Sequence, residues 1–171
     1  TPDKPFFVYY APGTSHAPHH APADWIARYK GRFDEGWDVI RERTLARQKA
    51  LGIAPRDARL AARPDSIPAW STLSAEQKRV YAHEMEVYAA ALSFADHEIG
   101  RVVEEARKEA GGNLMVVYIQ GDNGASAEAG LDGTLNEHAA ISGINDDLKT
   151  IAANRDNMGG PEALNQYSIG W

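Results

Sequence analysis

The order of elements predicted along the 171-residue chain indicates an α/β fold, in which long crossover helices join parallel strands. Residues 6–10 and 114–119 are short runs of apolar and aromatic side chains, which are typical of buried strands. Between them, residues 74–112 show the clearest helical periodicity in the chain. A strand followed by helices and then by a second strand predicts that both strands run parallel in one sheet.

The first crossover helices are preceded by a proline-rich loop. Residues 11–22 contain three prolines, which exclude a helix or a central strand. Pro22 then opens a short helix that is expected to continue to Tyr29. A second helix is predicted over residues 35–51, because this stretch has an apolar side and Gly52 suits its C-terminal cap.

The long helix has the strongest local signals. Residues 54–71, with three prolines, predict an extended loop before it, and Trp70 is the expected anchor of that loop. Ser74 and Gln77 then form a capping box, in which each side chain satisfies a free backbone N–H of the other residue. The apolar face of the helix consists of Tyr81, Met85, Tyr88, Leu92, Ala95, Ile99, Val102 and Ala106.

The chain after Gly124 is rich in Gly, Asn and Asp, and only short elements are predicted in it. Residues 146–153 are expected to form one short helix, and Pro161 is expected to open another. We expect residues 1–171 to be a single-domain, internal segment of a longer protein, because the first residue is not Met and apolar residues continue to the last position.

Composition excludes several classes of function. The formal net charge is −6, so there is no basic excess to bind nucleic acid or an anionic membrane surface. The absence of cysteine excludes a disulfide, a thiolate metal site and a cysteine nucleophile within this chain. No apolar run approaches the length that a membrane-spanning helix needs. We therefore expect neither a nucleic-acid nor a membrane partner.

Asp122 and Asn123 are the candidate metal ligands. They follow the second predicted strand, and the carboxyl ends of parallel strands are where α/β proteins place their chemistry. Their side-chain oxygens suit calcium or magnesium, whereas a zinc site would more often contain a histidine here. The alternative is that Asp122, Asn123 and Gly124 form an ordinary turn.

His16 is the candidate catalytic residue, because it is the histidine closest to the end of the first predicted strand. An imidazole there could bind a sulfate or phosphate oxygen, or act as the acid for a leaving group. The alternative is an exposed side chain in a proline-fixed loop. His19 and His20 are adjacent and cannot easily converge on one ion with His16. Glu128 and the run Asn136, Glu137 and His138 could line the site, but the polarity of a loop explains them equally well.

Several segments together carry a resemblance to bacterial arylsulfatases of the alkaline-phosphatase-like superfamily. These segments are residues 6–22, 29–38, 122–128, 159–161 and 165–171. The resemblance implies a partial alkaline-phosphatase-like α/β fold and the hydrolysis of sulfate esters. It also implies one calcium ion, with Asp122 and Asn123 matching two of its ligands, and a role for His16 facing the substrate sulfate.

The chain departs from this family in lacking its nucleophile. The family uses a formylglycine made from Cys or Ser in a Cys/Ser-x-Pro/Ala-x-Arg motif, together with an N-terminal Asp pair for the metal and a Lys-x-His pair, and none of these motifs is found at the corresponding place in this chain. The resemblance therefore implies that the formylglycine lies outside this chain. We predict that the chain alone does not hydrolyse sulfate esters and binds calcium weakly. The sequence does not assign a cellular compartment to the protein. A periplasmic or secreted full-length protein is compatible with the resemblance.

Two other functions remain as alternatives. One is a phosphoesterase or phosphonate hydrolase of the same superfamily, although Asn123 in place of a histidine counts against a dizinc version. The other is a non-catalytic binding or structural domain, in which the loop after residue 121 is only a turn. Predicted strands without sheet neighbours would expose apolar edges, so self-association of the chain is also expected.

Overall fold

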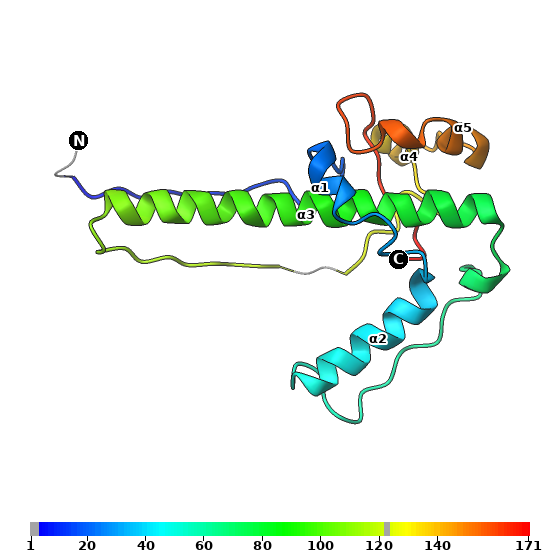
Figure 1. Cartoon of the computed structure of the whole chain (residues 1–171), viewed down its shortest axis with the longest axis horizontal. Coiled ribbons are helices and arrows are strands. Elements are labelled where there is room, and N and C mark those ends of the chain that lie inside the picture. The colour runs from blue at the N-terminus through cyan, green and yellow to red at the C-terminus, as the bar shows by residue number, and fades with distance from the viewer. Residues whose placement is uncertain (1–3, 122–123) are drawn as a thin grey trace.

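A single long helix, α3 (Ala75–Glu109), forms the axis of the molecule, and most other segments lie around its N-terminal half (Figure 1). The computed structural model describes residues 4–121 and 124–171 of the chain. The other helices in these residues are α1 (Ala23–Ala27), α2 (Gly36–Ala50), the 3₁₀ turn η1 (Trp70–Thr72), α4 (Glu137–Ile141), α5 (Leu148–Ala153) and the 3₁₀ turn η2 (Arg155–Asn157). Within the described ranges, no helix has the length and hydropathy needed to cross a membrane.

The predicted capping box is present and explains where α3 begins. The hydroxyl oxygen of Ser74 accepts the N–H of Gln77 at 3.2 Å, and the side-chain oxygen of Gln77 accepts the N–H of Ser74 at 2.9 Å. At the other end, Arg107 and Lys108 occupy the last turn, where positive charge is favoured by the helix dipole. The helix predicted from local signals is therefore confirmed.

The apolar face of α3 is buried only along its first half. The buried residues of the helix all lie between Val80 and Ala91. Beyond them, Leu92 and Val102 are 43% and 37% exposed. The second half of α3 therefore carries apolar side chains that the described residues leave open to solvent.

An aromatic core lies where the N-terminus of α2 meets α3. Trp37 is 1% exposed, and its ring packs edge-on against Trp70 with centroids 4.9 Å apart. The indole N–H groups find carbonyl partners, because Trp37 donates to Pro68 at 3.2 Å and Trp171 donates to Tyr81 at 2.9 Å. Trp70 is thus the anchor predicted for the loop before α3.

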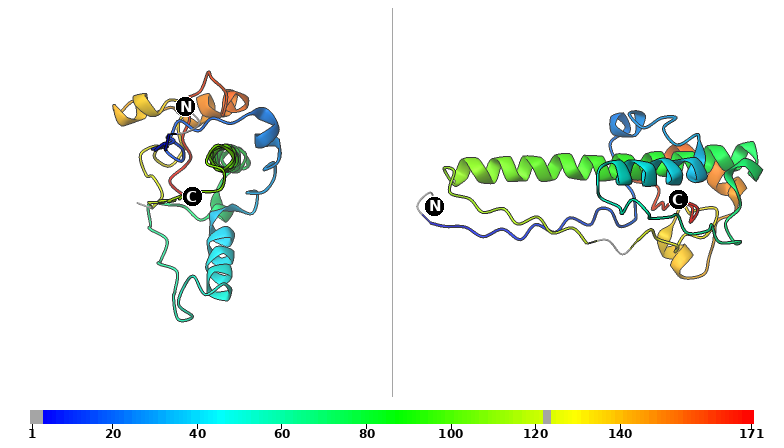
Figure 2. Two further views of the ribbon diagram at one scale, coloured as in Figure 1. Left: turned by 90° about the vertical axis from the view of Figure 1, so that its left-hand side faces the viewer. Right: turned by 90° about the horizontal axis from the view of Figure 1, so that it is seen from below.

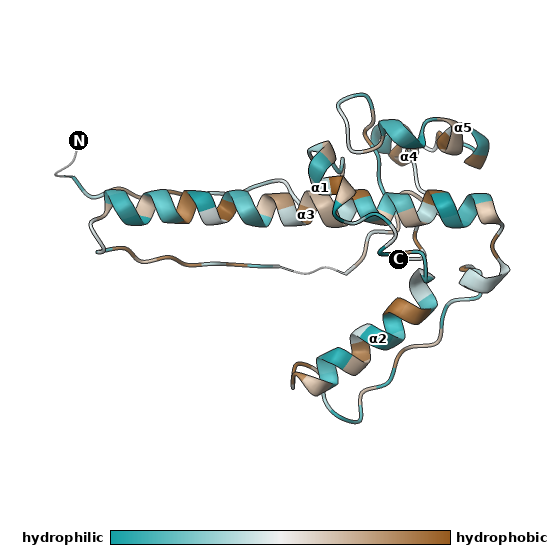
Figure 3. Cartoon of the chain, viewed as in Figure 1, coloured by the Kyte–Doolittle hydropathy of each residue, from teal (hydrophilic) through white to brown (hydrophobic). Residues whose placement is uncertain are grey.

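The two predicted parallel strands are not formed within residues 4–121 and 124–171. Residues 6–10 and 114–119 are extended and run in the same direction along α3, as a crossover requires, but they build no strand (Figures 1 and 2). Their side chains face solvent, with Phe7 90% and Met115 86% exposed. Figure 3 shows hydrophobic residues along the segment that follows α3. A parallel strand needs ladder partners and cover on both faces, and neither is supplied by the rest of the described chain.

The C-terminal third differs from its prediction in two elements. Residues 148–153 form α5 as expected, but no helix follows Pro161. Instead, Leu164 and Gln166 make isolated bridges with Asn136 and Thr134, which hold this segment extended. The residues after Pro161 therefore pair with a distant segment and do not form the helix that Pro161 alone predicted. The short helix α4 was not predicted.

Candidate functional site

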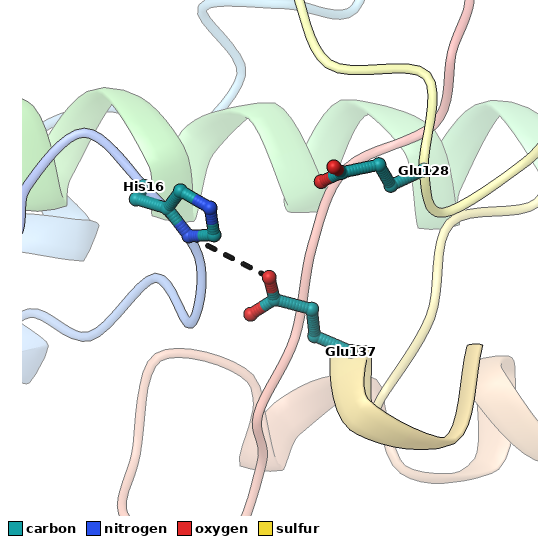
Figure 4. Close-up of side chains that lie close together, drawn as sticks. All are labelled: His16, Glu128 and Glu137. Carbon is teal, nitrogen blue, oxygen red and sulfur yellow. Dashed lines mark ion pairs between the residues drawn. The ribbon is translucent and has the colours of Figure 1, made fainter. Parts of the chain in front are cut away.

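A small hollow beside α3 collects side chains from three separate stretches of the chain. Its volume is about 40 Å³, and its walls come from Ser15, His16, Ala17, His19, Ser126, Glu128, Gln166 and Tyr167. The predicted catalytic histidine, His16, thus lies beside the loop that follows the predicted metal ligands. Two glutamates that sequence reasoning had left open, Glu128 and Glu137, lie near it (Figure 4).

His16 and Glu137 form an ion pair. The Nδ1 atom of His16 lies 3.5 Å from Oε1 of Glu137, and it also lies 2.7 Å from the carbonyl oxygen of Ala17. The hydrogen bond to Ala17 and the negative charge of Glu137 raise the pKa of His16 above its ordinary value, and Glu128 adds to the effect. The imidazole side chain is 69% exposed, whereas that of Glu137 is 5% exposed. An accessible histidine therefore lies beside a carboxylate that is itself largely buried, and this carboxylate favours the protonated form of the ring.

Backbone pairing between two distant segments places Glu137. Thr134 and Gln166 exchange two backbone hydrogen bonds of 3.1 Å, and the N–H of Glu137 donates to the carbonyl oxygen of Leu164 at 2.9 Å. The side chain of Asn136 caps α4 by accepting the N–H of Ala139 at 3.3 Å. Glu137 is then the first residue of α4, and its carboxylate reaches back to the His16 loop (Figure 4).

Glu128 is the second carboxylate near His16, and a hydroxyl group holds it in place. Ser126 donates to Oε2 of Glu128 at 3.1 Å, and the hydroxyl oxygen of Ser126 accepts a hydrogen from the Gln166 amide at 2.7 Å. Donor atoms of His16, Glu128 and Glu137 lie within 4.8 Å of one another. This spacing would also admit a cation, but exposed acidic groups are often this close without one. We therefore interpret the group as an ion-pair network around His16.

The other two histidines of the loop have different surroundings. His19 is 2% exposed, stacks on Tyr167 with centroids 5.4 Å apart and meets the edge of Tyr88. Burial lowers the pKa of His19 to about 4, so this ring is neutral at neutral pH. His20 lies 2.7 Å from the carbonyl oxygen of Ala163 through Nε2. The three histidines therefore do not converge, in agreement with the sequence analysis.

The predicted metal ligands Asp122 and Asn123 lie outside the described residues, so their assignment stays a prediction. The chain is described again from Gly124, and the N–H of Ser126 donates to the Tyr167 hydroxyl at 3.1 Å. Ser126 is thus fixed at the hollow that His16 lines. In the sequence it follows Asn123 by only three positions.

Gln166 is a residue of the site that sequence reasoning missed. Its side chain is almost fully buried, and it links Ser126 to the backbone pairing that places Glu137. No local motif marks it, because its role depends on contacts with residues about 30 to 40 positions earlier in the chain. Glu137 was noted in the sequence only as a polar residue in the loop after the predicted metal ligands, because no helix was predicted there.

Comparison with known proteins gives two kinds of match. The family model described as Sulfatase matches residues 1–156. The chain is similar to an uncharacterised sulfatase of Schizosaccharomyces pombe, with 30% identity over 168 residues that make up 97% of this chain and 29% of that protein. It is also similar to an arylsulfatase of Klebsiella aerogenes, with 33% identity over 129 residues that make up 75% of this chain and 27% of that protein. The chain thus spans less than a third of either relative.

Proposed function

The chain belongs to the sulfatase family, and we propose that it contributes one side of the active site of an arylsulfatase that hydrolyses sulfate esters. The family implies an alkaline-phosphatase-like α/β fold. We propose that residues 1–171 are one segment of that catalytic domain, in which residues 6–10 and 114–119 become parallel strands beside further strands. The similarity to a named arylsulfatase supports the reaction class. The observation that carries the proposal is the accessible His16 held by Glu137 at the edge of a hollow.

His16 would act on the substrate in two ways. As an imidazolium it attracts the negative charge of the sulfate group. When the bond between sulfur and the ester oxygen breaks, its electron pair goes to that oxygen, and His16 transfers a proton to it so that a neutral alcohol or phenol leaves. The raised pKa of His16 favours the protonated form that both tasks require.

A calcium ion is the proposed metal of the complete site. The oxygen donors of Asp122 and Asn123 suit it, because calcium is a hard cation that takes about six to eight oxygen ligands. When bound, calcium would neutralise charge on the sulfate and orient it for attack. This chain offers two predicted ligands, so the remaining ligands and the formylglycine nucleophile would come from outside it. We infer that residues 1–171 alone are inactive.

The test is hydrolysis of 4-nitrophenyl sulfate by the protein expressed from its complete coding sequence. We expect His16→Gln to lower kcat by about 10²- to 10⁴-fold, the range typical of a lost general acid. His138→Gln is the matched control, since His138 is an exposed histidine of α4 beside Glu137 and should leave kcat unchanged. Hydrolysis of 4-nitrophenyl phosphate in preference to the sulfate would replace the proposal by a phosphoesterase. Full activity of His16→Gln on the sulfate would remove His16 from the mechanism.

A further inference from the structure

The contacts of His16 define which ring nitrogen is available for chemistry. Nδ1 faces two acceptors, the carbonyl oxygen of Ala17 at 2.7 Å and the carboxylate of Glu137 at 3.5 Å. A carbonyl oxygen cannot donate, so we assign a hydrogen to Nδ1. Among the described residues Nε2 has no hydrogen-bond partner, and it is turned toward the side on which Glu128 lies (Figure 4). Nε2 is therefore the atom through which His16 would meet a substrate.

Glu137 is suited to orient this ring because its own position is fixed. It is 4% exposed, its N–H is bonded to Leu164, and it begins a helix capped by Asn136. A carboxylate that is largely removed from water is unfavourable without a positive partner. Within the described chain, His16 is the ion-pair partner of Glu137. Protonation of His16 therefore relieves the cost of burying the Glu137 charge.

The other charged or titratable groups near His16 do not hold its ring from a fixed, buried position as Glu137 does. Glu128 also attracts a proton to the ring, but it is exposed and belongs to a loop. His19 lies in the same loop as His16, and its pKa of about 4 leaves it uncharged at neutral pH. Glu137 is thus the one carboxylate of this group that is both buried and attached to a fixed backbone.

We propose that Glu137 is a positioning residue for the sulfatase reaction: it holds the Nδ1 side of His16 and keeps the ring protonated, so that Nε2–H faces the ester oxygen of the substrate. This inference rests on the proposed function of His16. The arrangement is the familiar one in which a carboxylate fixes the tautomer and orientation of a histidine and stabilises its cation. Glu137 itself does not touch the substrate.

The test compares Glu137→Gln with wild type in the protein made from its complete coding sequence. Histidine ring signals recorded by NMR against pH, with His16 assigned through His16→Gln, report the charge of His16 without any substrate. We expect Glu137→Gln to lower the pKa of His16, and Glu137→Asp to restore part of the difference because the charge is kept. Glu162→Gln removes an exposed glutamate from a neighbouring loop and should leave the pKa of His16 unchanged.

Activity supplies the second readout. A lower pKa means that His16 loses its proton at lower pH, so the alkaline limb of the profile of kcat against pH should move to lower pH in Glu137→Gln. At a pH on this alkaline limb, kcat of Glu137→Gln should be about tenfold below that of wild type. This loss is a modest part of what a general acid contributes. An unchanged pKa of His16 in folded Glu137→Gln overturns the inference. So does a wild-type His16 that titrates at or below the ordinary histidine value, whether or not the variant folds.

The two proposals can fail separately. If His16→Gln keeps full sulfatase activity while Glu137→Gln still lowers the pKa of His16, the role of His16 in catalysis is wrong, and so is the positioning role that depends on it. The ion pair itself would stand. If His16→Gln is inactive but Glu137→Gln changes neither the pKa nor the pH profile, only the positioning role is wrong.

Discussion

The backbone N–H of Ser168 donates to the carboxyl of Glu84 at 3.0 Å, and both residues have no exposed surface. Glu84 lies in the N-terminal half of α3, and Ser168 belongs to the C-terminal segment of the chain. The second carboxyl oxygen of Glu84 has no hydrogen-bond partner in the described chain. Burial raises the pKa of Glu84 well above its usual range, and the nearby Asp132 adds to this, whereas the bond from Ser168 opposes it. Burial therefore favours the neutral form of the Glu84 carboxyl in the folded protein.

Glu84 should make the protein less stable as pH rises. In the unfolded chain this group loses its proton above its ordinary pKa, whereas the folded protein retains it until the raised pKa is reached. Between these two values the folded state binds more protons, so the free energy of unfolding falls with increasing pH. Glu84→Gln should flatten this dependence in urea unfolding measured from pH 5 to 9. Glu109→Gln, at the exposed end of α3, should leave the slope unchanged, and an unaltered slope in Glu84→Gln would contradict the assignment.

Gly36 should not tolerate a side chain. Its φ of 81° is a conformation that favours glycine, and a Cβ placed there would overlap the ring of Trp70. We expect Gly36→Ala to lower the free energy of unfolding by about 2–4 kcal/mol, from strain and overpacking together. Gly52→Ala separates the two causes. Gly52 has a φ of 72° but nothing within 4 Å of the added atom, so a loss of only about 1–2 kcal/mol is expected. Equal losses in the two variants would exclude the Trp70 contact as a cause.

The parts of the fold that local signals encode could be predicted from the sequence. The start of α3 follows from Ser74 and Gln77, and α2 ends before the glycine chosen as its cap. The strands at residues 6–10 and 114–119 were predicted from their apolar side chains, but a strand is defined by hydrogen bonds to a neighbour. No neighbouring strand is present among the described residues. The apolar composition of the two runs could not show whether such a hydrogen-bonding neighbour exists.

The candidate site was predictable only in part, for a similar reason. His16 stood out because of its place after an apolar run. Glu137 could not be chosen, since the pairing of Thr134 with Gln166 brings it to His16, and that pairing joins segments far apart in sequence. The pattern of alternating polar residues in these segments fits many loops. Contacts of this kind depend on tertiary packing, which overrides the weak local preferences of short segments.

Calcium should stabilise the protein through Asp122 and Asn123. A ligand that binds only the folded state raises the midpoint of thermal unfolding, and the rise grows with affinity. The 171-residue chain offers two predicted ligands of the about six to eight that calcium prefers, so only a small rise is expected for it. The protein from the complete coding sequence should show a larger one. Asp122→Ala and Asn123→Ala should each abolish the effect, whereas Asp65→Ala, at an exposed loop position, should preserve it. Calcium stabilisation that survives both substitutions would place the ion elsewhere.

The 171-residue chain should self-associate through its two extended segments. Tyr9 is 84% exposed and Ile119 is 87% exposed, and both belong to apolar runs whose backbone edges have no ladder partner in the described structure. Such edges pair readily with edges of other chains, and the apolar area gained adds to the attraction. Light scattering should therefore show a mass that rises with protein concentration. Ile119→Lys should reduce this rise, because a charged side chain opposes edge-to-edge pairing.

Ile53→Lys is the matched control for self-association, because Ile53 is 71% exposed but lies just beyond α2, outside both extended segments. If it lowers the mass as much as Ile119→Lys, the effect comes from net charge and not from the segments. A monomeric mass at every concentration would mean that the exposed runs do not drive association. In the complete domain the same runs should be covered as strands, so the protein from the full coding sequence should show no such concentration dependence. Comparing the association of the 171-residue chain with that of the full-length protein thereby tests whether the two runs are paired in a parallel sheet.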